Sequence, residues 1–149
     1  MAKMSVPLRR TASTTASVGS ITADATRPRR FRLFDVVVGS EGSPADNAFL
    51  YVFQRCSAAG TSTAVVPRNL DPASATTEMD AGQNHTVEPT YTSANELLFI
   101  PVNQRATMRW VAAPGSELVF PATASNGVGV QTPTSAAVVV SVTAYVDEE

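Results

Sequence analysis

Apolar and polar residues alternate along several short stretches of this chain, and no window repeats its apolar residues at a helical spacing. Residues 30–38 (RFRLFDVVV) alternate and are rich in aromatic and β-branched side chains, which predicts a strand. Residues 48–56 (AFLYVFQRC) carry apolar side chains on both faces, which predicts a central strand covered from both sides. Further strands are predicted at 60–67, 95–102, 105–112, 117–121, 127–132 and 135–146.

Turn-forming residues separate these segments. Residues 39–47 (GSEGSPADN) predict a turn or loop. The tetrapeptide at 113–116 (APGS) predicts a type II turn in which glycine supplies the positive φ. Residues 68–90 form a long stretch with two prolines, Pro72 and Pro89, and we expect an irregular loop that serves a function or is held by a neighbouring chain.

About eight strands without a helix define the expected fold class: all-β, an antiparallel β-sandwich of jelly-roll type. An immunoglobulin-like connectivity stays open at this point. The length of 149 residues fits one domain, which we place at 29–149. Residues 1–28 are mostly Ser, Thr and Ala without apolar periodicity, and they predict a flexible arm, or alternatively a short edge strand at 17–22 (SVGSIT).

The charges are unevenly distributed along the chain. Residues 1–32 hold seven bases and one acid, a net charge of +6, whereas residues 33–149 hold four bases and twelve acids, a net charge of −8. A basic arm on an acidic body indicates a charged partner. Ten of the eleven bases are arginine, which favours directional pairing with an acidic protein surface over binding to a phosphate backbone, so we expect no direct contact with nucleic acid. The candidate anchoring residues are Arg9, Arg10, Arg27, Arg29, Arg30 and Arg32.

One cysteine and one histidine exclude an internal disulfide and a Cys/His zinc site, and we expect no metal and no cofactor. Cys56 ends an apolar run and is predicted to be buried. No apolar run is long enough to span a bilayer, and no apolar segment typical of a signal peptide follows the basic residues near the start. We therefore expect a soluble protein, made in a reducing cytoplasm and without a membrane partner.

Residues with catalytic potential are few. His85 lies near Asp80 and Glu88 in the sequence, and Glu78 and Asp80 could form a carboxylate pair, but such residues in a polar loop are usually solvated and have no catalytic role. The serines lack the surroundings of a nucleophile elbow. We therefore predict that the protein is not an enzyme.

Aromatic residues offer a different kind of site. Trp110 beside Arg109 could stack on a sugar or a base, although a strand tryptophan more commonly lies in a core or an interface. We assign Trp110, Arg109, Phe120 and Tyr91 to the core or to an interface. A carbohydrate- or receptor-binding module that uses Trp110, Tyr91 or Tyr51 is an alternative.

Three segments, 60–72 (GTSTAVVPRNLDP), 81–92 (AGQNHTVEPTYT) and 101–135 (PVNQRATMRWVAAPGSELVFPATASNGVGVQTPTS), resemble small virion proteins of tailed bacteriophages. The chain is similar in particular to capsid decoration, or cement, proteins. That resemblance implies a homotrimer on the outer surface of the phage head, made in the bacterial cytoplasm, with the major capsid protein as partner. It also implies a role in bridging capsid subunits, with the basic arm as the anchor. A jelly-roll coat subunit with a nucleic-acid-binding arm is the second possibility.

Overall fold

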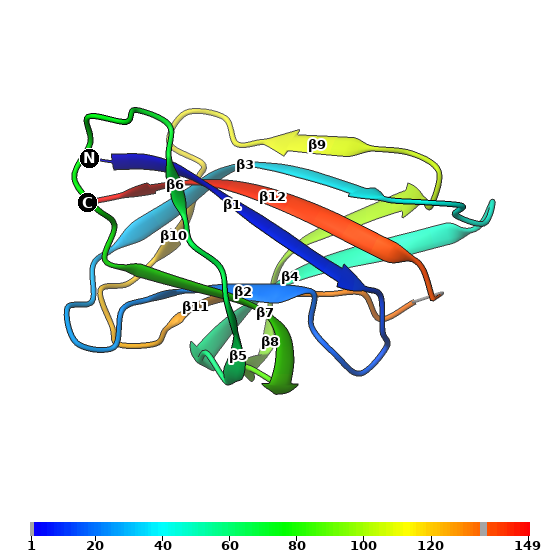
Figure 1. Cartoon of the computed structure of the whole chain (residues 1–149), viewed down its shortest axis with the longest axis horizontal. Helices are drawn as coiled ribbons and strands as arrows, with labels where there is room; N and C mark the ends of the chain where they lie inside the picture. The colour runs from blue at the N-terminus through cyan, green and yellow to red at the C-terminus, as the bar shows by residue number, and fades with distance from the viewer. Residues whose placement is uncertain (1, 135–136) are drawn as a thin grey trace.

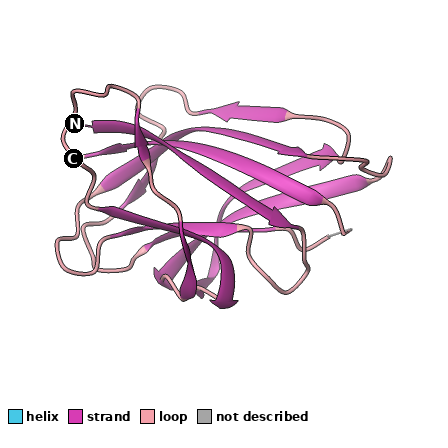
Figure 2. Ribbon diagram, viewed as in Figure 1, coloured by secondary structure: helices cyan, strands magenta, loops and turns pink. Residues whose placement is uncertain are grey.

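The computed structural model describes residues 2–134 and 137–149, and its regular elements are all strands (Figures 1 and 2). The strands form two antiparallel sheets that pack face to face, which confirms the expected all-β antiparallel sandwich. Sheet 1 contains β1 (Ala2–Thr11), β3 (Phe31–Ser40), β6 (Arg68–Asn69), β9 (Met108–Val111), β10 (Leu118–Phe120) and β12 (Val139–Glu148). Sheet 2 contains β2 (Gly19–Ala23), β4 (Ala48–Ala58), β5 (Thr61–Ala64), β7 (Met79–Val87), β8 (Thr90–Asn103) and β11 (Gly127–Gln131). None of the described residues belongs to a helix that could cross a membrane.

The order of the strands fixes which edges face one another. Sheet 1 runs β10–β3–β12–β1–β6, with β9 also paired to β3, and sheet 2 runs β5–β7–β2–β11–β4–β8. Across the sandwich β1 contacts β2 and β7. The β6 end of sheet 1 therefore lies over the β7–β5 end of sheet 2, and the β9–β10 end lies over β8.

The core lies between the two sheets and follows the alternation of each strand. In β12, Val140, Val142, Ala144 and Val146 are buried, while Ser141, Thr143 and Tyr145 between them face outward. The rings of Phe31 and Phe120 stack in this core with centroids 4.8 Å apart. The apolar side chains that alternate along β3 and β12 thus supply much of the driving force for folding.

The N-terminal residues do not form the expected flexible arm. β1 pairs with β12 over ten residue pairs, from Ala2 with Glu148 to Thr11 with Val139. Its inward side chains, among them Met4 and Leu8, are buried. The boundary expected near residue 28 is therefore wrong, and the sandwich includes the described part of residues 1–28.

Two features of β1 conceal it in the sequence. Polar residues occupy its outward positions, and Pro7 interrupts the pattern expected of a central strand. The N–H of Arg9 points away from β12, toward the side chain of Gln83. Pro7 is two residues from Arg9, so its backbone nitrogen also points away from β12. It faces the part of the β1 edge that β6 leaves uncovered, where a proline is tolerated because no N–H is needed for pairing.

Other boundaries also differ from the sequence-based expectation. The strand proposed as an alternative near 17–22 exists as β2, but it lies inside sheet 2 between β7 and β11 rather than at an edge. The loop expected at 68–90 contains β6 and the nine-residue strand β7. Of the strand expected at 135–146, residues 135–136 lie outside the described residues, and β12 begins at Val139.

Several local expectations are confirmed. β4 lies between β11 and β8, and its side chains are buried on both faces, with Tyr51 on one face and Val52 on the other. Cys56 is buried and unpaired. In the predicted turn, Ser116 N donates to the carbonyl of Ala113 and Gly115 has a φ of 83°.

The burial of β1 gives a direct prediction. Leu8→Ala should lower the free energy of unfolding by about 2–5 kcal/mol, because it opens a cavity where Leu8 packs against Gly19. Ser5→Ala, on the outward face of the same strand, should change it by less than about 0.5 kcal/mol. Denaturant unfolding of both variants checks this. A Leu8→Ala variant as stable as the wild type would mean that β1 is detached in solution.

Candidate functional site

The arginines expected to anchor the chain lie on the body of the sandwich, in β1, in the β2–β3 loop and in β3. Five of the six form ion pairs with acids of the same chain. Arg29 lines a small cleft together with Glu148 and Glu149. The pairs are Arg9 with Glu41, Arg10 with Glu88, Arg27 with Glu78, Arg30 with Glu149, and Arg32 with Asp147 and Glu149.

These pairs differ in burial and therefore in what they do. Arg32 Nε donates to Asp147 Oδ1 at 3.0 Å, and the two side chains are only 25% and 11% exposed. This pair joins β3 to β12, and the bond to Asp147 raises the pKa of the Arg32 guanidinium. By contrast, the side chains of Arg27 and Arg30 are mostly exposed, and such pairs contribute little to stability. The β2–β3 loop arginines therefore remain accessible to a partner, whereas Arg32 is structural.

Arg109 and Trp110 lie on β9 but point in different directions. The Arg109 guanidinium contacts the buried carboxylate of Asp35, with Nε 3.0 Å from Oδ1, and so fastens β9 to β3. Trp110 is half-buried and packs against the core. Phe120 is completely buried, with the Arg55 guanidinium 5.0 Å from its ring centroid. Of these residues, Phe120 belongs to the core and is not available to an interface.

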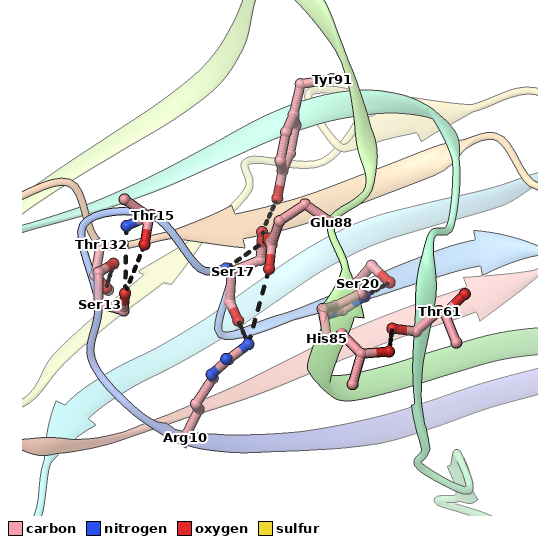
Figure 3. Close-up of polar contacts among 11 residues, drawn as sticks. Arg10, Ser13, Thr15, Ser17, Ser20, Thr61, His85, Glu88, Tyr91 and Thr132 are labelled. Carbon is pink, nitrogen blue, oxygen red and sulfur yellow. Dashed lines mark hydrogen bonds and ion pairs between the residues drawn. The ribbon is translucent and has the colours of Figure 1, made fainter.

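Tyr91 belongs to a polar network on the outer face of sheet 2 whose centre is Ser17 (Figure 3). Ser17 donates to Glu88 Oε2 from its backbone N at 2.7 Å and from its Oγ at 2.5 Å. Tyr91 Oη lies 2.6 Å from Ser17 Oγ, and because the Ser17 hydroxyl proton is directed to the carboxylate, Tyr91 donates in this bond. Arg10 Nη1 donates to the carbonyl of Ser17 at 3.0 Å. The network holds the β1–β2 loop against the start of β8.

The surroundings of Tyr91 explain a glycine in β11. A Cβ atom on Gly129 would lie 2.2 Å from Tyr91 Oη, so only glycine leaves room for the phenol. Burial raises the pKa of this phenol, which stays neutral and keeps its proton as a donor. Sequence analysis assigned Tyr91 to the core or an interface but missed its partners. Ser17 and Tyr91 are 74 residues apart, and no local pattern signals their contact.

His85 lies beside this network and is buried. Its Nε2 is 3.1 Å from Ser20 Oγ, while Nδ1 has no hydrogen-bond partner among the described residues. Burial lowers the pKa of the imidazole, and this effect exceeds the opposing influence of Glu88 and of the nearby Ala59 carbonyl. The ring is therefore held in its neutral form.

A cleft of about 320 Å³ opens next to Ser20 between β2, β5 and β7. Its polar lining includes the hydroxyls of Ser20, Thr61 and Ser62 and the carboxyl of Asp80, whose pKa is raised by burial. The Ser20–His85 contact has the spacing of a nucleophile and a base. However, β2 is paired on both edges, so its backbone N–H groups are engaged in the sheet and form no oxyanion hole there.

Among the described residues, no three His, Cys, Asp or Glu side chains gather to hold a metal ion.

Exposed large apolar side chains lie at two edges of the sandwich. The first group lies on β8 and β9 and is called the β8–β9 edge: Phe99, Met108 and Val111, which are 56%, 47% and 56% exposed. The second follows β5, β6 and β7 and is called the β5–β7 edge: Val66, Leu70 and Val87, which are 61%, 50% and 58% exposed. In the first group Phe99 lies on the outer face of sheet 2 and Val111 on the outer face of sheet 1, so these side chains do not form a single patch.

Sequence analysis did not single out these edge residues. A usable signal exists in β8, where Phe99 lies on the face opposite to the buried Ile100. Apolar residues on both faces of an edge strand indicate that its outer face is covered in the functional state.

Comparisons with known proteins add no identification, since neither a protein-family model nor a curated protein sequence matches this chain.

The polar network is testable by a double-mutant cycle. Ser17→Ala and Tyr91→Phe each remove one end of the same hydrogen bond. Their effects on the free energy of unfolding should therefore be non-additive, with a coupling of about 0.5–3 kcal/mol. The matched control is Ser17→Ala combined with Ser141→Ala on the other sheet, which should be additive within about 0.5 kcal/mol. Additive effects of Ser17→Ala and Tyr91→Phe would exclude the network.

The buried neutral His85 predicts a pH dependence. Because the folded-state pKa is lowered, the unfolded chain binds the proton more tightly, and stability is lost as the pH falls below the ordinary pKa of about 6.5. Between about pH 7.5 and pH 5.5 the wild type should lose unfolding free energy relative to His85→Gln. Chemical denaturation at both pH values measures the difference. Parallel pH profiles of the two proteins would place His85 in contact with water.

Proposed function

We propose that this protein is a structural protein of a phage virion, a capsid decoration protein with a sandwich of jelly-roll type. It binds the outer surface of the head as a trimer and bridges neighbouring copies of the major capsid protein. The observation that carries the proposal is the group of exposed arginines, Arg27, Arg29 and Arg30, in the β2–β3 loop. The resemblance of residues 60–72, 81–92 and 101–135 to phage virion proteins supports the capsid as the surface that the protein binds.

The strand pairing supports the jelly-roll type. Four nested pairs run inward from the chain ends: β1 with β12, β2 with β11, β3 with β9 and β10, and β4 with β8. They correspond to one long hairpin that is rolled so that β12 also meets β3 and β11 also meets β4. Eight-stranded jelly rolls have this arrangement and are common in viral capsids. The segment β5–β7 is then an insertion between the fourth and fifth strands.

The site of attachment on this protein is the β2–β3 loop, in place of the arm that the sequence suggested. Arg27 and Arg30 are well exposed, and Arg29 lies between them in the chain. Arginine forms directional, bidentate bonds with carboxylates, which suits attachment to an acidic face of a capsid subunit. Their intramolecular partners, Glu78 and Glu149, hold the side chains in place until they exchange for the carboxylates of the capsid.

The alternatives have less support. A nucleic-acid-binding arm requires a segment detached from the body, whereas Ala2–Thr11 forms β1 of sheet 1 and is paired with β12. A carbohydrate-binding module requires an exposed aromatic ring. Tyr51 is buried and donates to the carbonyl of Gly39, and Trp110 packs against the core.

The decisive experiment is binding to heads of the phage that encodes the protein, after removal of the resident copies. The protein should sediment with the heads and raise the temperature at which they release DNA. The triple variant Arg27→Ser/Arg29→Ser/Arg30→Ser should bind the heads with an affinity that is lower by about ten-fold or more. Its thermal unfolding should be unchanged, because exposed ion pairs contribute little to stability.

Arg68→Ser is the matched control, because Arg68 is an exposed arginine on β6, outside the β2–β3 loop. This variant should bind heads like the wild type. Failure of the wild-type protein to bind heads would refute the proposed function. Equal binding by the triple variant would refute the β2–β3 loop as the anchor.

A further inference from the structure

We propose that the cleft between β2, β5 and β7 binds a small primary amine, a short alkyl chain with an ammonium group at one end and a hydroxyl group at the other. The cleft has a volume of about 320 Å³, and small-molecule sites in proteins begin at about this size. The ammonium group lies against Asp80 and Thr22, and the hydroxyl group lies against Ser20 and Ser62. This site uses none of the β2–β3 loop arginines and does not rest on the proposed function.

Strand pairing places the polar side chains of the cleft at two separate ends. Ile21 of β2 points into the core, so Ser20 and Thr22 on either side of it point to the outer face of sheet 2. Thr22 is paired with Asp80 of β7, and Ser20 is paired with Gly82. Residues paired in this way lie side by side on the same face. One polar end of the cleft is therefore at Thr22 and Asp80, and the other is at Ser20, about 7 Å away along the strand.

Ser62 of β5 completes the second of these ends. A Cβ atom on Gly82 would clash with Ser62 Oγ, so the glycine leaves room for this hydroxyl to rest over β7 next to Ser20. The Ser20 hydroxyl is held in place by His85, whose Nε2 lies 3.1 Å from Ser20 Oγ (Figure 3). Each hydroxyl can both donate and accept, so the pair suits a hydroxyl group of the ligand.

The polar groups at the first end lack partners within the chain. Thr22 is only 1% exposed, and neither its hydroxyl nor the Asp80 carboxylate has a hydrogen-bond or ion-pair partner among the described residues. A buried hydroxyl without a partner costs free energy, which a bound donor recovers. The rim of the cleft at residues 60–62 is exposed, so a ligand reaches this end from solvent.

The sign of the charge selects an amine as the ligand. Among the described residues that line the cleft, Asp80 alone is charged. Burial and the nearby carboxylate of Asp24 raise the pKa of the Asp80 carboxyl, as expected where no cation compensates it. An ammonium group supplies the missing positive charge and three N–H donors, whereas carboxylates and phosphates are repelled. Ala59, Ala64 and Ala81 line the remainder of the cleft and suit the alkyl chain.

The experiment compares three probes of equal length that differ in the charge of one end: 4-amino-1-butanol, 1,4-butanediol and 4-hydroxybutanoate. Each is titrated at pH 7 into the purified, ¹⁵N-labelled protein, and amide chemical shifts are followed by NMR. The amine should shift the Thr22 and Asp80 amide signals to saturation. The diol and the carboxylate should bind about ten-fold more weakly or worse, because they lack the charge-assisted bond to Asp80. No saturable shift with the amine, or equal binding of the diol or the carboxylate, would overturn the proposal.

Asp80→Asn tests the carboxylate, because it removes the charge and keeps the size of the side chain. Its affinity for 4-amino-1-butanol should be lower than that of the wild type by about ten-fold or more. Asp71→Asn is the matched control, since Asp71 is an exposed aspartate that does not line the cleft, and this variant should bind like the wild type. Equal affinities of Asp80→Asn and the wild type would show that the amine does not bind at Asp80.

Thr22→Val tests the buried hydroxyl with two readouts. Because this hydroxyl has no partner in the free protein, the variant should unfold at a temperature no lower than the wild type, while its affinity for 4-amino-1-butanol should fall several-fold. Wild-type affinity, or a lower unfolding temperature, would contradict the role of Thr22 in the site. Failure of this inference is distinguishable from failure of the proposed function, because the probes are titrated without phage heads. A protein that binds the amine and no heads keeps the site and refutes decoration, while the opposite result does the reverse.

Discussion

The ladder between β1 and β12 joins the two ends of the chain, and the remaining pairs depend on it. Because β2 follows β1 and β11 precedes β12, pairing of the outer strands brings β2 and β11 side by side in the other sheet. The ladder also fixes the inward face of β1, so that Met4, Val6 and Leu8 complete the core. The strand pairs β1–β12 and β2–β11 join residues that are far apart in the sequence, so the fold depends on long-range pairing.

The same ladder changes the meaning of the charge asymmetry. A basic N-terminal segment and an acidic remainder indicate an external partner only if the two parts stay apart. Here β1, the β2–β3 loop and β3 lay the basic residues against acids of the body, as in the pairs Arg9–Glu41 and Arg32–Asp147. Most of the asymmetry is therefore satisfied within the molecule. Arg9, Arg27 and Arg30 are mostly exposed, and each is paired with an acid of the same chain.

The strands that could be predicted from the sequence are those whose own residues decide their conformation. β3 and β4 have dense β-branched and aromatic residues, and both begin within one residue of the predicted position. β1 and β7 contain proline, glycine and polar residues and become strands because neighbours pair with them. The network around Tyr91 was invisible for the same reason, since its members come from β1, the β1–β2 loop and the start of β8.

The edges of the two sheets determine how such a protein can associate without aggregating. Open edge strands invite the addition of further strands. β8, however, has Pro101 near its end and register shifts against β4, and Ala94 has a positive φ of 53°. Irregular backbone of this kind is a poor template for another strand, while the exposed side chain of Phe99 remains available. Contacts at this edge would therefore form through side chains and would be limited in extent, unlike an open-ended β-ladder.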